Sequence, residues 1–189
     1  MISSLFAWGL LSAVLVIAVW HDMATRRIPN RLVLLGVLTG VACNLLAPRG
    51  AGLFLDGGGG VGVGNALLGM LTGGALLLPA YLLHALGAGD VKLMAAIGAF
   101  LGLPQVLGAV LLSFLAGGVL SLAVAVVSRS VPRVIDNLRL ISISIVAKQS
   151  GGLRVTDIPT TGRLPYAIAI FCGTVLQIWL CNNFAWPFL

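Results

Sequence analysis

The hexapeptide Gly87-Ala88-Gly89-Asp90-Val91-Lys92 decides how the rest of the chain is interpreted. It places a carboxylate between glycines and opens an apolar run over residues 91–103. An acid at the edge of a hydrocarbon layer is costly, and such residues commonly mark functional sites in membrane proteins. The glycines allow backbone to come close to Asp90, or to the group on which Asp90 acts. The stretch therefore predicts a membrane protein with a functional carboxylate at one membrane face.

The composition argues against an ordinary soluble domain. The 189 residues are 59% hydrophobic and 8% charged, with a mean hydropathy of +1.11, whereas soluble domains carry about 25% charged residues. Long apolar runs instead predict an all-α, polytopic membrane protein, and we expect a single membrane-embedded domain over residues 1–189. The net charge of +6 arises from basic residues in loops beside apolar runs. These residues indicate membrane topology and contact with lipid headgroups rather than nucleic acid binding.

Six apolar segments predict about six transmembrane helices, since one span needs roughly 20 residues. They cover residues 5–20, 32–46, 61–84, 91–103, 104–127 and 164–186. Pro79 predicts a kink in the third segment. The fourth segment is short for a full span, and a shortened or tilted helix there would leave Asp90 in a recess that water can reach.

The basic residues predict the orientation of the chain. With six spans, three alternate loops share one side of the membrane and hold ten of the 11 Lys and Arg residues, whereas Arg49 lies on the other side. The positive-inside rule predicts that these three loops are cytoplasmic and that both termini are non-cytoplasmic. The long connection at about 128–162 is then a cytoplasmic loop, and its stretch 134–147 fits either an interfacial helix or a strand. Asp22 and Asp90 are therefore predicted to lie at the same, cytoplasmic, face.

Peptide hydrolysis by carboxylates needs two of them, close together and sharing one proton. The ionised partner draws a proton from water and the protonated partner donates to the scissile carbonyl, so the pair titrates as a unit. Of the five acids, only Asp22 and Asp90 adjoin spans on the same face. Each also has a structural interpretation, because Asp22 could pair with Arg26 one turn on and Asp90 could cap the fourth helix.

Metal-ligating residues show no grouped pattern. The three cysteines (43, 172 and 181) form no Cys-x-x-Cys motif, lie in apolar runs and are interpreted as small buried hydrophobes. Two isolated histidines, His21 and His84, have no third ligand and do not predict a metal site. We therefore expect neither a metal nor an organic cofactor.

Three motifs, taken together, are similar to those of one protein family. After Asp22 come Arg27-Ile28-Pro29-Asn30-Arg31-Leu32, then Gly87-Ala88-Gly89-Asp90-Val91-Lys92-Leu93, then Leu164-Pro165-Tyr166-Ala167-Ile168-Ala169. In this order and spacing the chain resembles, over nearly its whole length, the type IV prepilin leader peptidases within the Gly-x-Gly-Asp aspartyl proteases. The resemblance implies that Asp22 and Asp90 are the catalytic pair. It also implies cleavage of the leader of prepilin-like or pseudopilin-like substrates at the cytoplasmic face of the inner membrane.

The same motifs contain residues that we expect to shape the site. They are Gly87, Gly89, Lys92, Pro29, Asn30, Pro165 and Tyr166. Pro29 and Asn30 predict the turn after the first span. Lys92 could lower the cost of charge at Asp90, bind a substrate carbonyl, or anchor its helix at the membrane surface.

One part of the larger members of this family has no counterpart here. Those proteins carry an N-terminal part with paired Cys-x-x-Cys motifs and also methylate the new amino terminus of the substrate. The chain resembles instead the small peptidases of Flp/Tad pilus systems, and we expect no N-methyltransferase activity. The sequence specifies no oligomeric state.

Two other functions use the same residues differently. A small proton- or cation-coupled transporter could bind its ion at Asp22 and Asp90, but it would hold such acids near mid-membrane on broken helices. A non-catalytic assembly scaffold would keep its function after either acid is neutralised. The predicted position of both acids at one membrane edge favours the peptidase.

Overall fold

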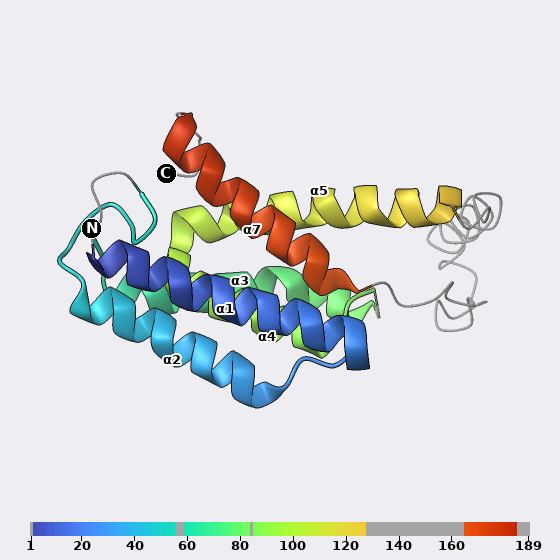
Figure 1. Ribbon diagram of the computed structural model, residues 1–189, viewed down its shortest axis with the longest axis horizontal. Helices are drawn as coiled ribbons and strands as arrows, with labels where there is room; N and C mark the ends of the chain where they lie inside the picture. The colour runs from blue at the N-terminus through green and yellow to red at the C-terminus, as the bar shows by residue number, and fades with distance from the viewer. Residues whose placement is uncertain (1, 56–58, 84, 128–164, 185–189) are drawn as a thin grey trace, which may run out of the picture. The chain divides into compact units, whose positions relative to one another are not determined.

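The computed structural model describes residues 2–55, 59–83, 85–127 and 165–184 (Figure 1). Its elements, in chain order, are α1 (Ile2–Thr25), α2 (Asn30–Leu46), α3 (Val63–Leu82), α4 (Ala88–Leu101), α5 (Leu103–Val127) and α7 (Tyr166–Asn183). These ranges contain helices and one isolated bridge between Arg49 and Gly60, but no strand. The predicted all-α class is confirmed.

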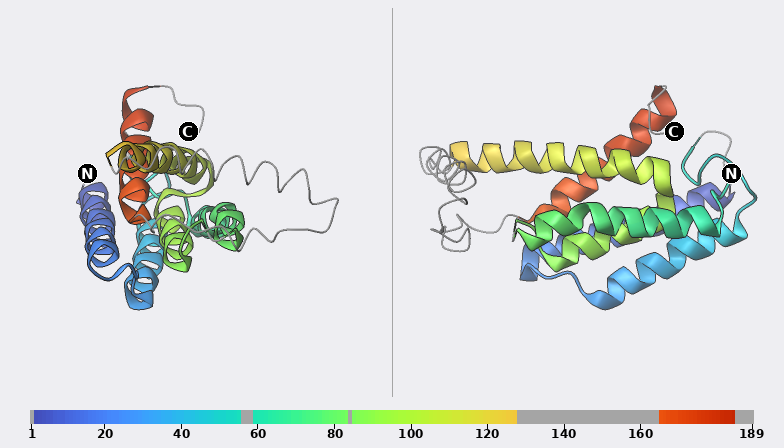
Figure 2. Two further views of the ribbon diagram at one scale, coloured as in Figure 1. Left: turned by 90° about the vertical axis from the view of Figure 1, so that its right-hand side faces the viewer. Right: turned by 180° about the vertical axis from the view of Figure 1, so that it is seen from behind.

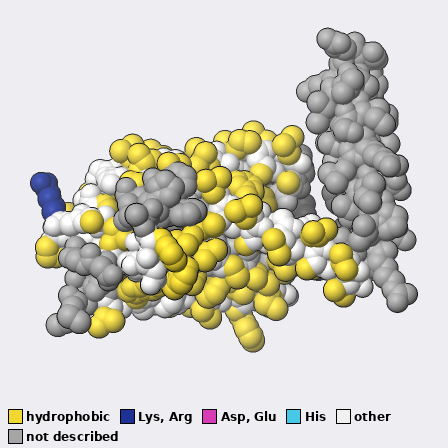
Figure 3. Space-filling model, turned by 90° about the horizontal axis from the view of Figure 1, so that it is seen from above, with side chains coloured by type: hydrophobic (Ala, Val, Ile, Leu, Met, Phe, Trp, Pro, Cys, Tyr) yellow, Lys and Arg dark blue, Asp and Glu magenta, His cyan; other side chains and the backbone are white. Residues whose placement is uncertain are grey.

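Four of these helices, α1, α3, α5 and α7, are long and apolar enough to cross a membrane. The other two are shorter, with 17 residues in α2 and 14 in α4. The surface carries many exposed large hydrophobic side chains, including Leu35, Leu71 and Leu115. Figure 3 shows one face of the molecule, on which hydrophobic side chains are widespread. Apolar exposure on this scale suits contact with lipid rather than with water. The polytopic membrane fold is therefore confirmed.

The first helix runs further than its hydropathy predicted. The apolar run ends at Trp20, but α1 continues to Thr25, so that Asp22 lies inside the helix instead of following it. Arg26 then has a φ of +53°, a left-handed conformation that ends the helix, and its N–H donates to the Asp22 carbonyl at 2.9 Å. The backbone of Asp22 therefore lies within regular helix, one turn before the end of α1.

The described residues do not test two of the features predicted from the sequence. Pro79 lies inside α3, which continues to Leu82, and the kink there stays a prediction. The loop at about 128–162, including its stretch 134–147, lies outside the described residues.

The chain divides into two compact units, one formed by residues 1–117 with 165–189 and the other by residues 118–164. The single domain over residues 1–189 stays a prediction, and all the residues discussed below belong to the first unit.

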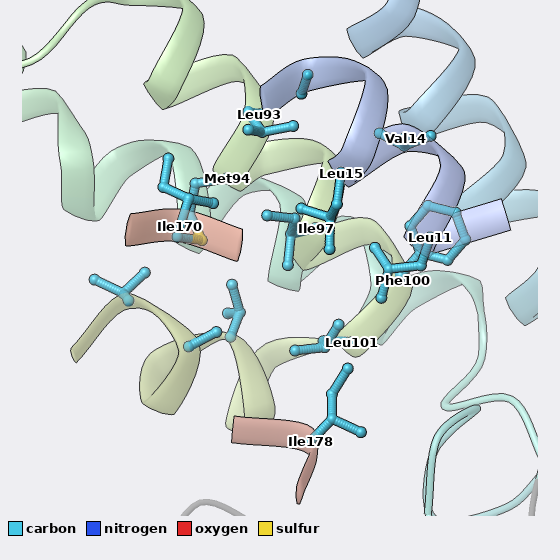
Figure 4. Close-up of a cluster of buried hydrophobic side chains, with 14 of the residues drawn as sticks. Leu11, Val14, Leu15, Leu93, Met94, Ile97, Phe100, Leu101, Ile170 and Ile178 are labelled. Atoms are coloured by element: carbon cyan, nitrogen blue, oxygen red, sulfur yellow. The ribbon is translucent and has the colours of Figure 1, made fainter. Parts of the chain in front are cut away.

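Helix α4 is the central element of the first unit (Figure 2), because every residue from Leu93 to Leu101 except Ala95 is buried. Side chains of α1, α4 and α7 meet in one apolar cluster (Figure 4), among them Leu15, Ile97 and Ile170. On another face α4 packs against α3 through glycines, since a methyl group on Gly69 or Gly98 would collide with the backbone of the other helix. Such close packing fixes the C-terminal part of α4 relative to α3.

The C-terminal end of α4 is also fixed by a buried amide. The Asn44 side chain, 3% exposed, donates to the carbonyls of Ala99 at 2.9 Å and Phe100 at 3.1 Å. Its oxygen accepts the N–H of Val61 at 3.0 Å. One residue of α2 therefore holds the end of α4 and the chain that leads into α3.

We expect Asn44→Ala to destabilise the folded protein by on the order of 2 kcal/mol, because it leaves buried backbone groups without partners. Thermal unfolding of the purified protein in detergent measures the effect as a lower Tm. Asn183→Ala is the matched control, since the exposed Asn183 amide bonds only the Trp179 carbonyl of its own helix. Equal Tm values for the two variants would contradict this role of Asn44.

Candidate active site

Asp22 is held by a backbone group far away in the sequence. Its carboxylate, 9% exposed, accepts the N–H of Ala167 at 3.1 Å. Ala167 lies in the first turn of α7, where backbone N–H groups have no partner within the helix. A helix N-terminus stabilises negative charge. The contact therefore gives the Asp22 carboxyl a fixed hydrogen-bond partner at the start of α7.

Asp90 is held by the turn that precedes its own helix. It is the third residue of α4, and its carboxylate accepts the N–H of Gly87 at 3.0 Å, while its own N–H donates to the Gly87 carbonyl at 3.1 Å. The N-cap of α4 is Gly87, and Asp90 lies three residues after it. The interpretation of Asp90 as the capping residue is therefore wrong. The carboxylate instead reaches back to the cap residue, as in one half of a capping box.

The two carboxylates share one electrostatic environment. Asp90 lies in the first turn of α4, outside the four helices that are long enough to cross a membrane. Burial is the main cause that raises the pKa of Asp90 to about 6. The Gly87 N–H acts in the opposite direction, and the Asp22 charge contributes the smallest part of the rise. At neutral pH a carboxyl of this kind is far easier to protonate than an exposed aspartate. The site thus combines one carboxyl held by the start of α7 with a second carboxyl whose pKa is raised by burial.

The glycines of the hexapeptide leave space for these contacts. A methyl group on Gly89 would lie 3.1 Å from Cβ of Ile28, which belongs to the turn between α1 and α2. A methyl group on Gly87 would lie 3.3 Å from Oδ2 of Asp90. Gly87 has a φ of −82°, which any residue can adopt, so the requirement at this position is space and not backbone conformation. Both glycines allow other groups to approach the first turn of α4.

Lys92 connects the beginnings of two helices. Its Nζ donates to Oδ1 of Asn30 at 2.9 Å, and Asn30 is the first residue of α2. Pro29 is the N-cap of α2, with a φ of −62°. Within the described ranges Lys92 forms no ion pair with an acid. Lys92 and Asn30 therefore fix the rim of the site, while Asp22 and Asp90 lie in its buried part.

Tyr166 is the first residue of the helix whose first turn holds Asp22. Pro165 is the N-cap of α7, and the Tyr166 hydroxyl donates to the Ser113 carbonyl of α5 at 3.2 Å. The ring occupies a space that Gly117 leaves open, since a methyl group there would collide with it. The sequence placed Tyr166 in a motif but gave no sign of its contacts in α5.

Three of the sequence interpretations can be compared directly with these contacts. No ion pair joins Asp22 to Arg26 in the described part of the chain, so the structure does not support the helix-pair interpretation of Asp22. The prediction for the cysteines is right for Cys181, which is buried, and wrong for Cys172, which is exposed on α7. Across the described residues, no three His, Cys, Asp or Glu side chains are grouped so that they could hold a metal ion.

Comparisons with known proteins identify one family that the chain matches. A sequence model of the type IV leader peptidase family matches residues 9–122, which is more than half of the chain and includes both Asp22 and Asp90. Searches against curated proteins and solved structures gave no significant match.

Proposed function

Because the chain belongs to the type IV leader peptidase family, we propose that it is an aspartic endopeptidase that removes the leader of prepilin-like proteins at the cytoplasmic face of the inner membrane. The family supports a prepilin-type peptidase role in general. One observation carries the aspartic mechanism: backbone N–H groups at the starts of α7 and α4 hold Asp22 and Asp90, and the Asp22 charge acts on Asp90. This arrangement suits a pair that shares one proton.

The two environments favour different roles for the two acids. Asp22, which accepts the N–H of Ala167, takes a proton from water while the water oxygen attacks the scissile carbonyl carbon. Asp90, whose raised pKa favours the protonated form, gives its proton to the carbonyl oxygen. In the second step Asp22 protonates the leaving nitrogen, the C–N bond breaks and Asp90 recovers a proton from the hydroxyl that becomes the new carbonyl. Both acids then return to their starting states.

The lipid-facing side of α1 suggests how the substrate reaches this pair. Trp20 and Met23, on either side of Asp22 in sequence, are 73% and 63% exposed. The scissile bond of a prepilin adjoins the substrate's own hydrophobic helix, so a lateral approach through the bilayer brings this bond to the membrane edge. Indole side chains favour that interface.

Cleavage by the full-length protein in reconstituted membranes tests the function. We expect a prepilin-like substrate to lose the mass of its leader, and no organic or metal cofactor to be required. Proteoliposomes of the same preparation should show no proton or cation flux coupled to a solute. Flux that depends on Asp22 and Asp90, without cleavage of any prepilin in a panel, would favour the transporter instead.

The pH dependence of cleavage follows from the environment of Asp90. Above its pKa of about 6, Asp90 loses the proton that it must donate, so we expect kcat/KM to fall as pH rises, by up to about tenfold per unit. Initial rates over a series of buffers at constant ionic strength measure this alkaline limb. The midpoint belongs to the coupled pair rather than to one residue. A rate that stays constant from about pH 6 to pH 8 would contradict Asp90 as the acid.

A further inference from the structure

The turn that follows α1 is braced by its own hydrogen bonds. The Asp22 carbonyl accepts the N–H of Arg26 at 2.9 Å, where α1 ends. The Thr25 hydroxyl lies 2.9 Å from the His21 carbonyl and 3.2 Å from the Arg27 carbonyl, and it can donate to either. The segment between Asp22 and the start of α2 therefore has a defined path, so the position of one end constrains the position of the other.

The far end of this turn is fastened to α4 at two points. Ile28 packs against Gly89, since a methyl group on Gly89 would lie 3.1 Å from Cβ of Ile28. Two residues after Ile28, the Asn30 side chain accepts a hydrogen bond from Nζ of Lys92 at 2.9 Å. Gly89 directly precedes Asp90, and Lys92 follows it by two residues. The two contacts thus lie on either side of Asp90 in sequence.

Helix electrostatics do not explain why a lysine makes this contact. The N-terminus of a helix carries partial positive charge, which disfavours a cation there, and Asn30 is the first residue of α2. The Lys92 side chain is exposed and forms no ion pair with an acid in the described part of the chain. A polar contact at such a surface adds little to stability. A local rule broken without an evident gain in stability is typical of functional sites.

We propose that Lys92 and Asn30 are a positioning pair, whose hydrogen bond fixes Asp22 and Asp90 relative to one another. The inference rests on the proposed peptidase function, because it concerns the same two acids. The contacts form a closed ring, which runs from Asp22 along the turn to Asn30, across to Lys92 and back along α4 to Asp90. Neither Lys92 nor Asn30 takes or gives a proton in the reaction. Without their bond the turn and the start of α4 can separate, and catalysis by positioned groups is sensitive to such shifts.

A double-variant cycle tests the proposal on the full-length protein, with cleavage of a prepilin substrate in reconstituted membranes. Lys92→Met removes the donor and keeps the apolar stem, and Asn30→Ala removes the acceptor. We expect each variant to lower kcat about tenfold, with KM unchanged within about twofold. The double variant should show the same loss of about tenfold, because both changes remove one hydrogen bond, whereas two independent effects would multiply to about a hundredfold.

Two further variants control for the chemistry of the changes. Asn30→Asp keeps an oxygen that can accept from Lys92, so we expect its kcat to stay within about twofold of the wild-type value. Arg31→Met is the matched control, because it removes a cation from the next exposed residue, whose side chain forms no hydrogen bond within the described residues. It should leave kcat and KM unchanged. The Tm of every variant should equal that of the wild type.

The same experiment separates the alternatives. Losses that multiply in the double variant would mean that Lys92 and Asn30 act separately, and would overturn the proposal. A raised KM with an unchanged kcat would make Lys92 a substrate-binding residue, and a lower Tm with activity in proportion to the folded fraction would make the contact merely structural. Either result would overturn the positioning role. Wild-type protein that cleaves nothing, or an active Asp22→Asn variant, would count against the peptidase itself. An active wild type, an inactive Asp22→Asn and a fully active Lys92→Met would overturn only the positioning role.

Discussion

Asp22→Asn and Asp90→Asn are each expected to lower the rate of leader cleavage by about a thousandfold or more, within the range that general acid and base groups contribute. Asparagine keeps the size and polarity of aspartate but can neither take a proton from water nor give one to the carbonyl. Its side-chain oxygen can still accept a hydrogen bond, so the Ala167 N–H at position 22 and the Gly87 N–H at position 90 keep a partner. The fold should therefore survive while the chemistry is lost.

The mass of the processed substrate, measured after incubation with membranes that hold equal amounts of each variant, decides this prediction. Asp56→Asn is the matched control, because it makes the same chemical change at an acid predicted to lie on the opposite side of the membrane. Full processing by either Asp22→Asn or Asp90→Asn would remove that residue from the mechanism. It would also make the transporter or the assembly scaffold the better interpretation.

Gly89→Ala is expected to lower kcat about 10- to 100-fold without unfolding the protein. The new methyl group would lie 3.1 Å from Cβ of Ile28 and 3.3 Å from its Cγ1. The turn that carries Asp90 must then shift by a fraction of an ångström. Catalysis by positioned groups is sensitive to such shifts, and a displacement of 1 Å can cost about a hundredfold. Steady-state kinetics together with Tm distinguish this effect from a loss of stability.

A double variant isolates the contact that causes the effect. Ile28→Ala removes Cγ1 and Cδ1 but leaves Cβ, so we expect Gly89→Ala with Ile28→Ala to recover part of the lost activity. Gly9→Ala provides the control for the glycine change itself, because nothing lies within 4 Å of a methyl group at that position. If Gly89→Ala is as active as Gly9→Ala, the space at Gly89 has no part in positioning Asp90.

The sequence predicted the fold class well because lipid imposes a simple rule on it. A run of about 20 apolar residues must become a helix, and helices α3 and α5 lie within or close to the predicted segments. The end of α1 was predicted less well, since hydropathy falls after Trp20 but the chain contains no helix breaker before Pro29. Hydropathy indicates where the segment in contact with lipid ends, and the helix can continue beyond that residue.

The candidate site was predictable in its side chains but not in its backbone contacts. Charge and topology singled out Asp22 and Asp90, because carboxylates are rare in this chain. The partner of Asp22 is the N–H of Ala167, 145 residues further on, and the partner of Tyr166 is a carbonyl at Ser113. Every residue except proline carries an N–H and every residue carries a carbonyl, so residue type could not point to these two. Only the fold selects them.

The bond from Ala167 to Asp22 also has a consequence for biosynthesis. A ribosome makes the chain from α1 onwards, and domains form in the order of their synthesis, so both aspartates enter the membrane well before α7 emerges. Until then Asp22 lacks the N–H that holds its carboxylate. In the proposed mechanism a half-made chain therefore carries both acids but not their working arrangement. That mechanism predicts that cleavage begins only after α7 has been inserted.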